Sequence, residues 1–414
     1  MVDDRGTVGP EDISWRRNLY ALWIAQLLAI IGFSMRAPFL PFFLEDVGAT
    51  SFSSQALWAG AINAGGALVM AVSAPIWGIV ADRRGRKIMV LRAMFVAGFT
   101  IGLMSLAQSP WHLLILRFIE GGFTGTVAAS TTLIASTTPR RSRGFALGMM
   151  QTAIFSGASV GPLFGGFLAD QIGYRPTFVA SGVLLFIGGV LVLTQVKERF
   201  ERPRPAADGA PAGPSTRTLL LGTAMIAMII VMFSLRAATS AIQPIMPLFV
   251  QNLAPESGSI ATLAGVALGI TGLTSAASAV FLGRLADRRG HTKILLACSF
   301  GVAVLYLPLA IVQAPWQLIV GSGLVGIAAG GVAPSANAVI TNLTPTARRG
   351  VVFGFTSAVA ALGGFVGPIG GSAIAATIDI RLVFVAISAL MGTAALWIVI
   401  SLRKGVDLDA EGED

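Results

Sequence analysis

Long apolar runs separated by short polar segments fill most of the chain. A helix needs roughly twenty apolar residues to cross a bilayer, and most of these runs reach that length. The pattern therefore predicts an all-α membrane protein with about twelve transmembrane helices. We expect them near residues 17–44, 55–81, 88–108, 111–137, 144–170, 175–196, 218–250, 258–286, 292–312, 315–343, 349–376 and 381–402.

Polar segments at both ends and near the middle divide the chain. Residues 197–217 are charged and rich in Pro, Ala and Gly, which is typical of a flexible linker. Residues 1–16 and 403–414 are polar tails. The sequence thus predicts a six-helix bundle over 17–196 and a second one over 218–402.

Composition supports an integral membrane protein. Hydrophobic residues make up 54% of the chain and charged residues 12%, and the mean hydropathy is +0.78, whereas soluble domains carry about 25% charge. The net charge of +9 does not indicate nucleic-acid binding, because the bases lie in short clusters between apolar runs. Cys298 is the only cysteine, which excludes an internal disulfide or a thiolate metal cluster.

The distribution of basic residues predicts the orientation in the membrane. Of the 29 Lys and Arg residues, Arg36, Arg117 and Arg236 lie inside predicted spans. Arg175 and Arg381 lie in loops on one side of the membrane, and the remaining 24 lie in or beside segments on the other side. Because Lys and Arg are enriched in cytoplasmic loops, we expect both termini in the cytoplasm.

The two halves repeat at a spacing of 205–206 residues. The polar turn Gly78–Lys87 recurs as Gly283–Gly290, again between two apolar runs. Other residue pairs keep the same register through five pairs of spans, which indicates a parallel duplication with a binding site near the midplane between the halves. These pairs are Pro38 and Pro244, Pro41 and Pro247, Trp111 and Trp316, Gly121 and Gly326, Pro139 and Pro345, and Pro162 and Pro368.

The duplicated turn and the spans around it resemble the major facilitator superfamily of secondary transporters, over residues 16–404. In that family the turn is a cytoplasmic latch that favours the outward-facing state. The alternative is a basic loop with a turn glycine, and the second copy departs from the pattern by having His291 where the first has Arg86. The resemblance implies a latch made of Gly78, Asp82, Arg83, Gly85, Arg86 and Asp287.

The fifth span contains a glycine-rich motif. Three of its glycines recur every four residues on one helix face, so that another backbone can approach closely, and its proline removes a helix hydrogen bond. The motif resembles the antiporter motif of the superfamily, which implies export by antiport, although ordinary close packing would use the same residues. Its members here are Gly157, Gly161, Pro162, Gly165 and Gly166.

The fourth span carries an ionisable pair. Arg117 and Glu120 are three residues apart and share a helix face. They resemble the family motif R-x-x-Q-G, with Glu120 where glutamine is usual. Ionisable residues in hydrocarbon are costly and usually functional, so we expect Glu120 to carry protons, with Arg117 tuning it. A static ion pair and a substrate contact are the alternatives.

Two further arginines lie inside spans. Arg36 and the Arg117–Glu120 pair all fall in the outer halves of their spans, so Arg36 could reach Glu120. Arg236 lies near the middle of the seventh span with no acid in a neighbouring span, which favours an anionic or zwitterionic ligand. The substrate-binding residues that we expect are Arg36, Arg236, Trp23, Phe33, Asn63, Gln151, Gln243 and Asn337. The alternatives are that the amides bond neighbouring helices and that Arg236 pairs with helix C-terminal carbonyls or water.

Among members of the superfamily, the chain looks most like the twelve-span drug–proton antiporters of the multidrug and tetracycline type. This resemblance implies a bacterial inner-membrane protein that exports amphiphilic small molecules by proton-coupled alternating access. We expect a monomer, because one chain already provides both halves that a cavity needs. The alternative is a proton-coupled carrier or flippase for an anionic metabolite or an amphiphilic lipid. We expect no enzymatic activity, cofactor, metal or nucleic-acid partner, because the sequence has no phosphate-binding loop, nucleophile triad or metal cluster.

Overall fold

The computed structural model describes residues 10–198, 222–345 and 348–403. Within these residues the secondary structure is helical throughout, and twelve segments are long and apolar enough to cross a membrane. The all-α class and the twelve spans predicted from the hydrophobic pattern are therefore confirmed.

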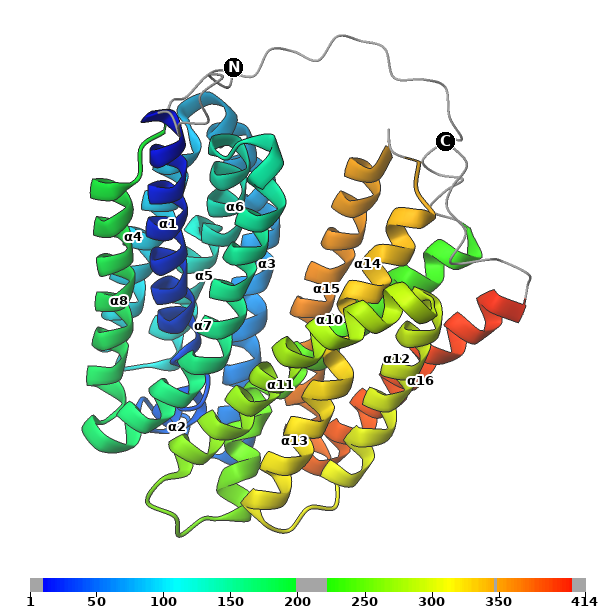
Figure 1. Ribbon diagram of the computed structural model, residues 1–414. Coiled ribbons are helices and arrows are strands. Elements are labelled where there is room, and N and C mark those ends of the chain that lie inside the picture. Colours follow the sequence, from blue (N-terminus) through cyan, green and yellow to red (C-terminus); the bar gives the residue numbers. More distant parts are fainter. Residues whose placement is uncertain (1–9, 199–221, 346–347, 404–414) are drawn as a thin grey trace.

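The helices form two successive groups (Figure 1). The first group is α1 (Pro10–Ser34), α2 (Leu40–Asp46), α3 (Phe52–Arg84), α4 (Arg86–Met104), α5 (Pro110–Phe123), α6 (Thr126–Thr137), α7 (Arg143–Ile172) and α8 (Tyr174–Gln195), with a 3-10 turn at Arg140–Ser142. The second is α10 (Thr223–Leu253), α11 (Ile260–Arg289), α12 (His291–Leu309), α13 (Pro315–Gly330), α14 (Val332–Asn342), α15 (Arg349–Thr377) and α16 (Ile380–Arg403).

Three predicted spans are broken rather than continuous, and these breaks lie near the functional residues. The first span stops at Ser34 and restarts as α2, since Pro38 has no N–H for the helix ladder. The fourth breaks at Gly125, whose φ of +129° is unfavourable for any other residue. The tenth breaks at Gly331, between α13 and α14.

The predicted boundaries differ from the structure at the N-terminus. Helix α1 begins at Pro10, inside the segment 1–16 that was expected to be a tail. Most of the predicted linker 197–217 and all but the first residue of the tail 403–414 lie outside the described residues. These predictions therefore remain untested.

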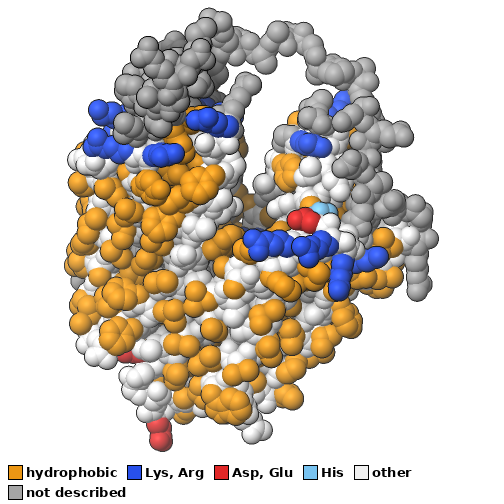
Figure 2. Space-filling view, in the orientation of Figure 1, with side chains coloured by type: hydrophobic (Ala, Val, Ile, Leu, Met, Phe, Trp, Pro, Cys, Tyr) orange, Lys and Arg blue, Asp and Glu red, His pale blue; other side chains and the backbone are white. Residues whose placement is uncertain are grey.

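The two groups form separate bundles, each with its own apolar core, which meet along two seams. Helix α7 packs along α11, and α3 packs along α15. The bundles diverge toward the end where α1 begins and α16 ends, and Figure 2 shows a hollow between them there with Lys and Arg side chains around it. We call this the basic end and the opposite one the closed end.

Candidate functional site

A buried ion triad lies in the first bundle. Arg36, in the turn between α1 and α2, reaches Glu120 on α5 with both terminal nitrogens, at 2.8 Å from Nη1 to Oε2 and 3.0 Å from Nη2 to Oε1. Arg117 Nη1 lies 2.5 Å from Glu120 Oε1. The Glu120 side chain is 0% exposed. The expected contact between Arg36 and Glu120 is therefore confirmed.

The triad changes the role expected for Arg36. Its bidentate geometry with Glu120 is the strongest form of arginine–carboxylate pairing, and its side chain is only 8% exposed. In this conformation Arg36 is therefore not a free charge for a substrate, contrary to the prediction. Two arginines share one carboxylate, so the group carries one net positive charge and ties the α1–α2 turn to α5.

Glycines on the neighbouring helix make room for the triad. A Cβ at Gly66 on α3 would lie 2.6 Å from Arg117 Nε, and one at Gly121 would collide with the Gly66 carbonyl. The glycine of the R-x-x-Q-G pattern therefore lets α5 approach α3. This approach keeps Arg117 beside Glu120 within the bundle.

The break after α5 leaves carbonyl groups that need partners. Trp77 Nε1 donates to Gly122 O at 2.6 Å, and Arg92 Nη2 donates to Thr124 O at 3.4 Å. The Arg92 guanidinium also stacks on the Trp77 ring, 3.5 Å from its centroid. These contacts fix the end of α5 one turn beyond Glu120.

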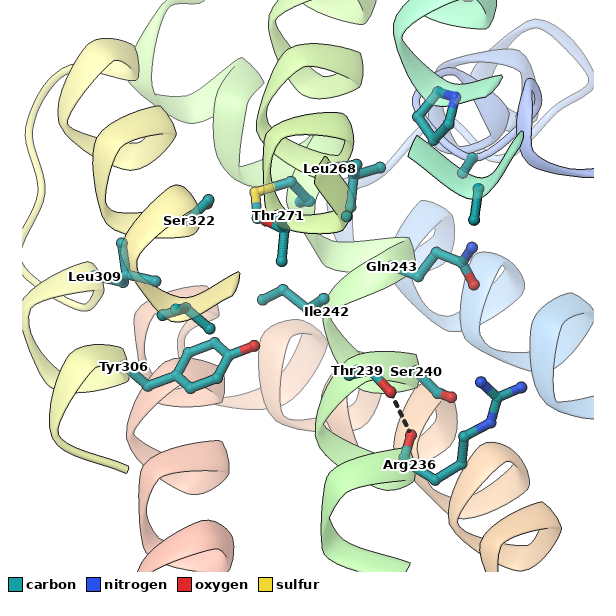
Figure 3. A pocket seen from close by; sticks show the side chains of 16 residues that line it. Arg236, Thr239, Ser240, Ile242, Gln243, Leu268, Thr271, Tyr306, Leu309 and Ser322 are labelled. Atoms are coloured by element: carbon teal, nitrogen blue, oxygen red, sulfur yellow. Dashed lines mark hydrogen bonds between the residues drawn. The ribbon is translucent and has the colours of Figure 1, made fainter. Parts of the chain in front are cut away.

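A cavity of about 280 Å³ lies between the bundles and extends into the second one. Arg236 and Gln243 both line it (Figure 3). They are seven residues apart on α10, which places them on one helix face. Arg236 forms no ion pair with any residue that the structure describes. Two of the predicted substrate-binding residues thus share a cavity that offers an uncompensated cation.

The other predicted substrate-binding residues do not line this cavity. Trp23 Nε1 donates to Thr152 Oγ1 on α7 at 3.0 Å, and Asn63 Nδ2 donates to Ala59 O in its own helix at 2.9 Å. These contacts stay within the first bundle. Phe33, Gln151 and Asn337 lie on α1, α7 and α14, away from the cavity lining.

The predicted latch lies at the basic end, where the bundles are apart. Gly85 ends α3 and precedes α4 with a φ of +95°, as expected for a turn glycine. Glu198 accepts the backbone N–H groups of Arg86 and Lys87 at 2.9 and 2.8 Å. Gly78 and Arg83 lie on α3, while the side chain of Asp82 is outside the description.

Asp287 of the second copy contacts its own bundle. Its Oδ1 lies 3.6 Å from Nε2 of His291, the first residue of α12, and its side chain is 71% exposed. Where the first copy has Arg86, this turn thus has a histidine that pairs locally. The latch would act in a state in which the basic end is closed, and it remains a prediction.

The glycine-rich motif of α7 serves two interfaces. A Cβ at Gly157 or Gly161 would lie 2.8 Å from Ile30 Cβ or 2.6 Å from Ser34 Cβ on α1. Gly166 faces the other way, against the backbone of Ala261 on α11, and the Pro162 carbonyl lies against Gly265. The helix continues through Pro162. The motif therefore packs α7 both inside its bundle and across the seam.

Gly165 should tolerate no side chain. A Cβ there would collide with Met35 O, a backbone atom in the α1–α2 turn, so we expect Gly165→Ala to lower the free energy of unfolding by roughly 1–3 kcal/mol, as overpacking does. Gly148 lies on the same helix with no atom within 4 Å of an added Cβ. Thermal unfolding in detergent should show a lower midpoint for Gly165→Ala and no loss for Gly148→Ala; equal midpoints would refute the close contact.

Sequence reasoning missed Asp170, at the end of α7. Its carboxylate accepts the backbone N–H groups of Ala261 and Thr262 at 3.3 and 2.7 Å and the Thr262 hydroxyl at 2.5 Å. These groups belong to the first turn of α11, in the other bundle. The sequence did contain a signal for this residue. At the repeat offset of 206 residues Asp170 corresponds to Ala376, so the acid is not part of the duplicated pattern.

Comparisons with known proteins agree with this architecture. The sequence profile described as Major Facilitator Superfamily matches residues 22–315 and 228–413. The multidrug resistance protein MdtG of Escherichia fergusonii is 35% identical over 372 residues, covering 90% of this chain and 91% of that protein. MdtG of Salmonella typhimurium is 33% identical over 399 residues, covering 96% and 98%.

Solved structures share the fold at low identity. A bacterial homologue of the human lysosomal transporter Spinster, inward-facing and occupied, superposes with a TM-score of 0.76 at 14% identity, covering 93% of this chain and 96% of that one. The human organic anion transporter MFSD10 gives 0.66 at 18% identity, covering 94% and 100%. With two six-helix bundles, a duplicated signature turn and these relatives, the chain belongs to the Major Facilitator Superfamily.

Proposed function

We propose that this protein is a secondary transporter that exports amphiphilic small molecules by alternating access. The observation that carries the proposal is the hollow between two bundles that are joined at one end and apart at the other. A cavity at the seam, with Arg236 and Gln243 in its lining, gives a substrate a place to bind. The multidrug resistance relatives at 33–35% identity support export of drug-like molecules.

The proposed location is the bacterial inner membrane, with both termini in the cytoplasm. The turns at the basic end carry the clustered arginines and lysines, and such clusters are typical of cytoplasmic loops. On this orientation the structure is open to the cytoplasm, which is the state that loads an exporter. One chain supplies both bundles, which favours a monomer.

Proton coupling is assigned to Glu120. It is an acid buried within a span, and both its partners are arginines, Arg36 in the turn between α1 and α2 and Arg117 three residues away on α5. A carboxylate that binds arginine in one state and loses it in another would release and take up a proton during the cycle. The static ion pair remains the competing role.

The second candidate is a carrier for an anionic metabolite or an amphiphilic lipid. The observation in its favour is Arg236, a cation that faces the cavity without a carboxylate partner among the described residues. An uncompensated cation inside a membrane protein attracts an anionic group. The two candidates differ in the charge of the substrate that they transport.

Proteoliposomes with an imposed pH gradient test these proposals. Matched cationic, neutral and anionic amphiphiles are added to wild type and to Arg236→Gln. Dissipation of the gradient by at least one compound is expected, and none would overturn proton-coupled transport. Arg236→Gln should reduce transport of the anionic compounds about tenfold and leave the neutral ones unchanged. Equal losses for all three charges would contradict a charge-reading role for Arg236.

A further inference from the structure

The inner part of the cavity is a recess in the second bundle. It is lined by Tyr306 and Leu309 of α12 and by Ser322 and Val325 of α13, while Arg236 of α10 lies nearer the first bundle (Figure 3). We call these four residues the recess. It reaches α12, which packs on α13, α14 and α16 at the side of the bundle away from the seams.

The repeat relates residues that line the cavity to the ion triad of the first bundle. At an offset of 205 residues, Ser322 corresponds to Arg117 and Val325 corresponds to Glu120. At the offset of 206 that relates the first and seventh spans, Ile242 of the cavity wall corresponds to Arg36. Two arginines and a glutamate of the first bundle thus correspond to three smaller, uncharged side chains in the lining of this cavity.

Polar groups in the recess are left without protein partners. Ser322 Oγ is buried and has no hydrogen-bond partner among the residues that the structure describes. Tyr306 is 5% exposed, no hydrogen bond of its hydroxyl to another described residue is found, and Figure 3 shows that hydroxyl pointing into the cavity. A buried hydroxyl without a partner, such as that of Ser322, is costly, and a ligand that bonds to it removes the cost, while the Tyr306 hydroxyl offers a second hydrogen-bonding group at the cavity.

We propose that this recess holds the apolar, hydroxyl-bearing end of an acidic amphiphile whose anionic group binds Arg236. The inference rests on the proposed transport function and names its substrate class. Leu309 and Val325 supply apolar contact, and Tyr306 and Ser322 supply hydrogen bonds. The cavity volume of about 280 Å³ is just below the range of about 300–1,000 Å³ for whole ligand sites, so it fits part of a molecule rather than all of it.

Equilibrium binding tests the proposal without requiring transport. The probes are radiolabelled octanoate and decanoate and their ω-hydroxy derivatives, applied to the purified full-length protein in lipid nanodiscs, with empty nanodiscs as the blank. For at least one chain length, wild type should bind the hydroxy acid roughly three- to tenfold more tightly than the parent acid, as expected for one net hydrogen bond.

Two variants test whether the recess causes the preference for the hydroxy acid. Tyr306→Phe should abolish the preference by weakening binding of the hydroxy acid about three- to tenfold, because the partner of its hydroxyl is removed. Ser322→Leu fills the recess and should weaken both acids about tenfold. If Ser322→Leu misfolds, the conservative Tyr306→Phe still decides the test.

Two outcomes would overturn the recess as a subsite. One is a wild type that binds hydroxy and parent acids equally at both lengths, and the other is a preference that survives Tyr306→Phe. Failure of the transport proposal is a separate result. In that case proteoliposomes would show no gradient-driven movement of the acids although the binding preference and its loss in Tyr306→Phe are both observed.

Discussion

Replacing Glu120 by glutamine is expected to abolish proton-driven efflux and to destabilise the protein. The substitution leaves Arg36 and Arg117 buried without the carboxylate that both of them contact. Removing one partner of a buried ion pair typically costs about 3–5 kcal/mol, because the remaining charge is uncompensated. Efflux driven by a pH gradient in proteoliposomes should fall at least tenfold, and the thermal unfolding midpoint should fall with it.

Loss of activity alone would not separate proton transfer from structure, so a second variant is needed. Arg36→Gln combined with Glu120→Gln leaves only Arg117 charged, which restores the net charge of +1 that the triad has in wild type. We expect this double variant to regain most of the lost stability. It should still fail in proton-driven efflux, while exchange of substrate across the membrane without a gradient continues.

Measurements on the double variant can also refute the assignment of proton transfer to Glu120. If it recovers both stability and proton-driven efflux, Glu120 is a structural partner of Arg36 and the proton is carried elsewhere. If the defect of Glu120→Gln depends on the charge of the substrate, Glu120 contacts the substrate instead. Each of the three roles that the sequence left open therefore has its own result.

The fold was predictable because the bilayer imposes long apolar runs and because duplication repeats their register. The breaks within the spans were harder to predict from the sequence. Gly125 and Gly331 lie within apolar sequence, where glycine also serves close packing. Only the backbone shows that Gly125 adopts a φ of +129° and lies between the end of α5 and the start of α6.

The site residues that could be predicted from the sequence are the charged ones, because charged residues are rare inside membrane spans. Arg36, Arg117, Glu120 and Arg236 were identified because charged residues inside spans are few, and span direction placed Arg36 near Glu120. Tyr306 and Ser322 carry no such signal, since hydroxyl side chains are common in membrane helices. These two residues matter because they line a cavity, and only the packing of α12 and α13 reveals that cavity.

Asp170 makes a charged contact across the α7–α11 seam, and no such contact across the α3–α15 seam is found among the described residues. Helix α11 has Ser259 before its first turn, but the serine side chain makes no capping bond. The carboxylate of Asp170 from the other bundle takes that place, where the helix dipole also favours a negative charge. At the second seam Ala376 corresponds to Asp170, and Ser53 Oγ on α3 donates to Ala376 O on α15 at 2.9 Å.

Asp170→Ala should therefore shift the protein toward the state in which the closed end is open. Hydrogen bonds to a charged group contribute about 1.5–3 kcal/mol, and a loss of 2–3 kcal/mol would change the ratio of the two states by about 30- to 150-fold. Spectroscopic distances between labels at Leu106→Cys and Ile311→Cys report this opening, because both residues are exposed loop positions in different bundles.

Ser53→Ala is the matched control, since it removes one neutral hydrogen bond at the equivalent place on the second seam. Its net effect should be about 0.5–1.5 kcal/mol, which is at most about tenfold in the same ratio. Cys298 is buried and is the only native cysteine, so background labelling is low. Equal shifts for the two variants would show that the Asp170 charge adds nothing to closure. A larger shift for Asp170→Ala would identify the α7–α11 seam as the one whose release permits opening.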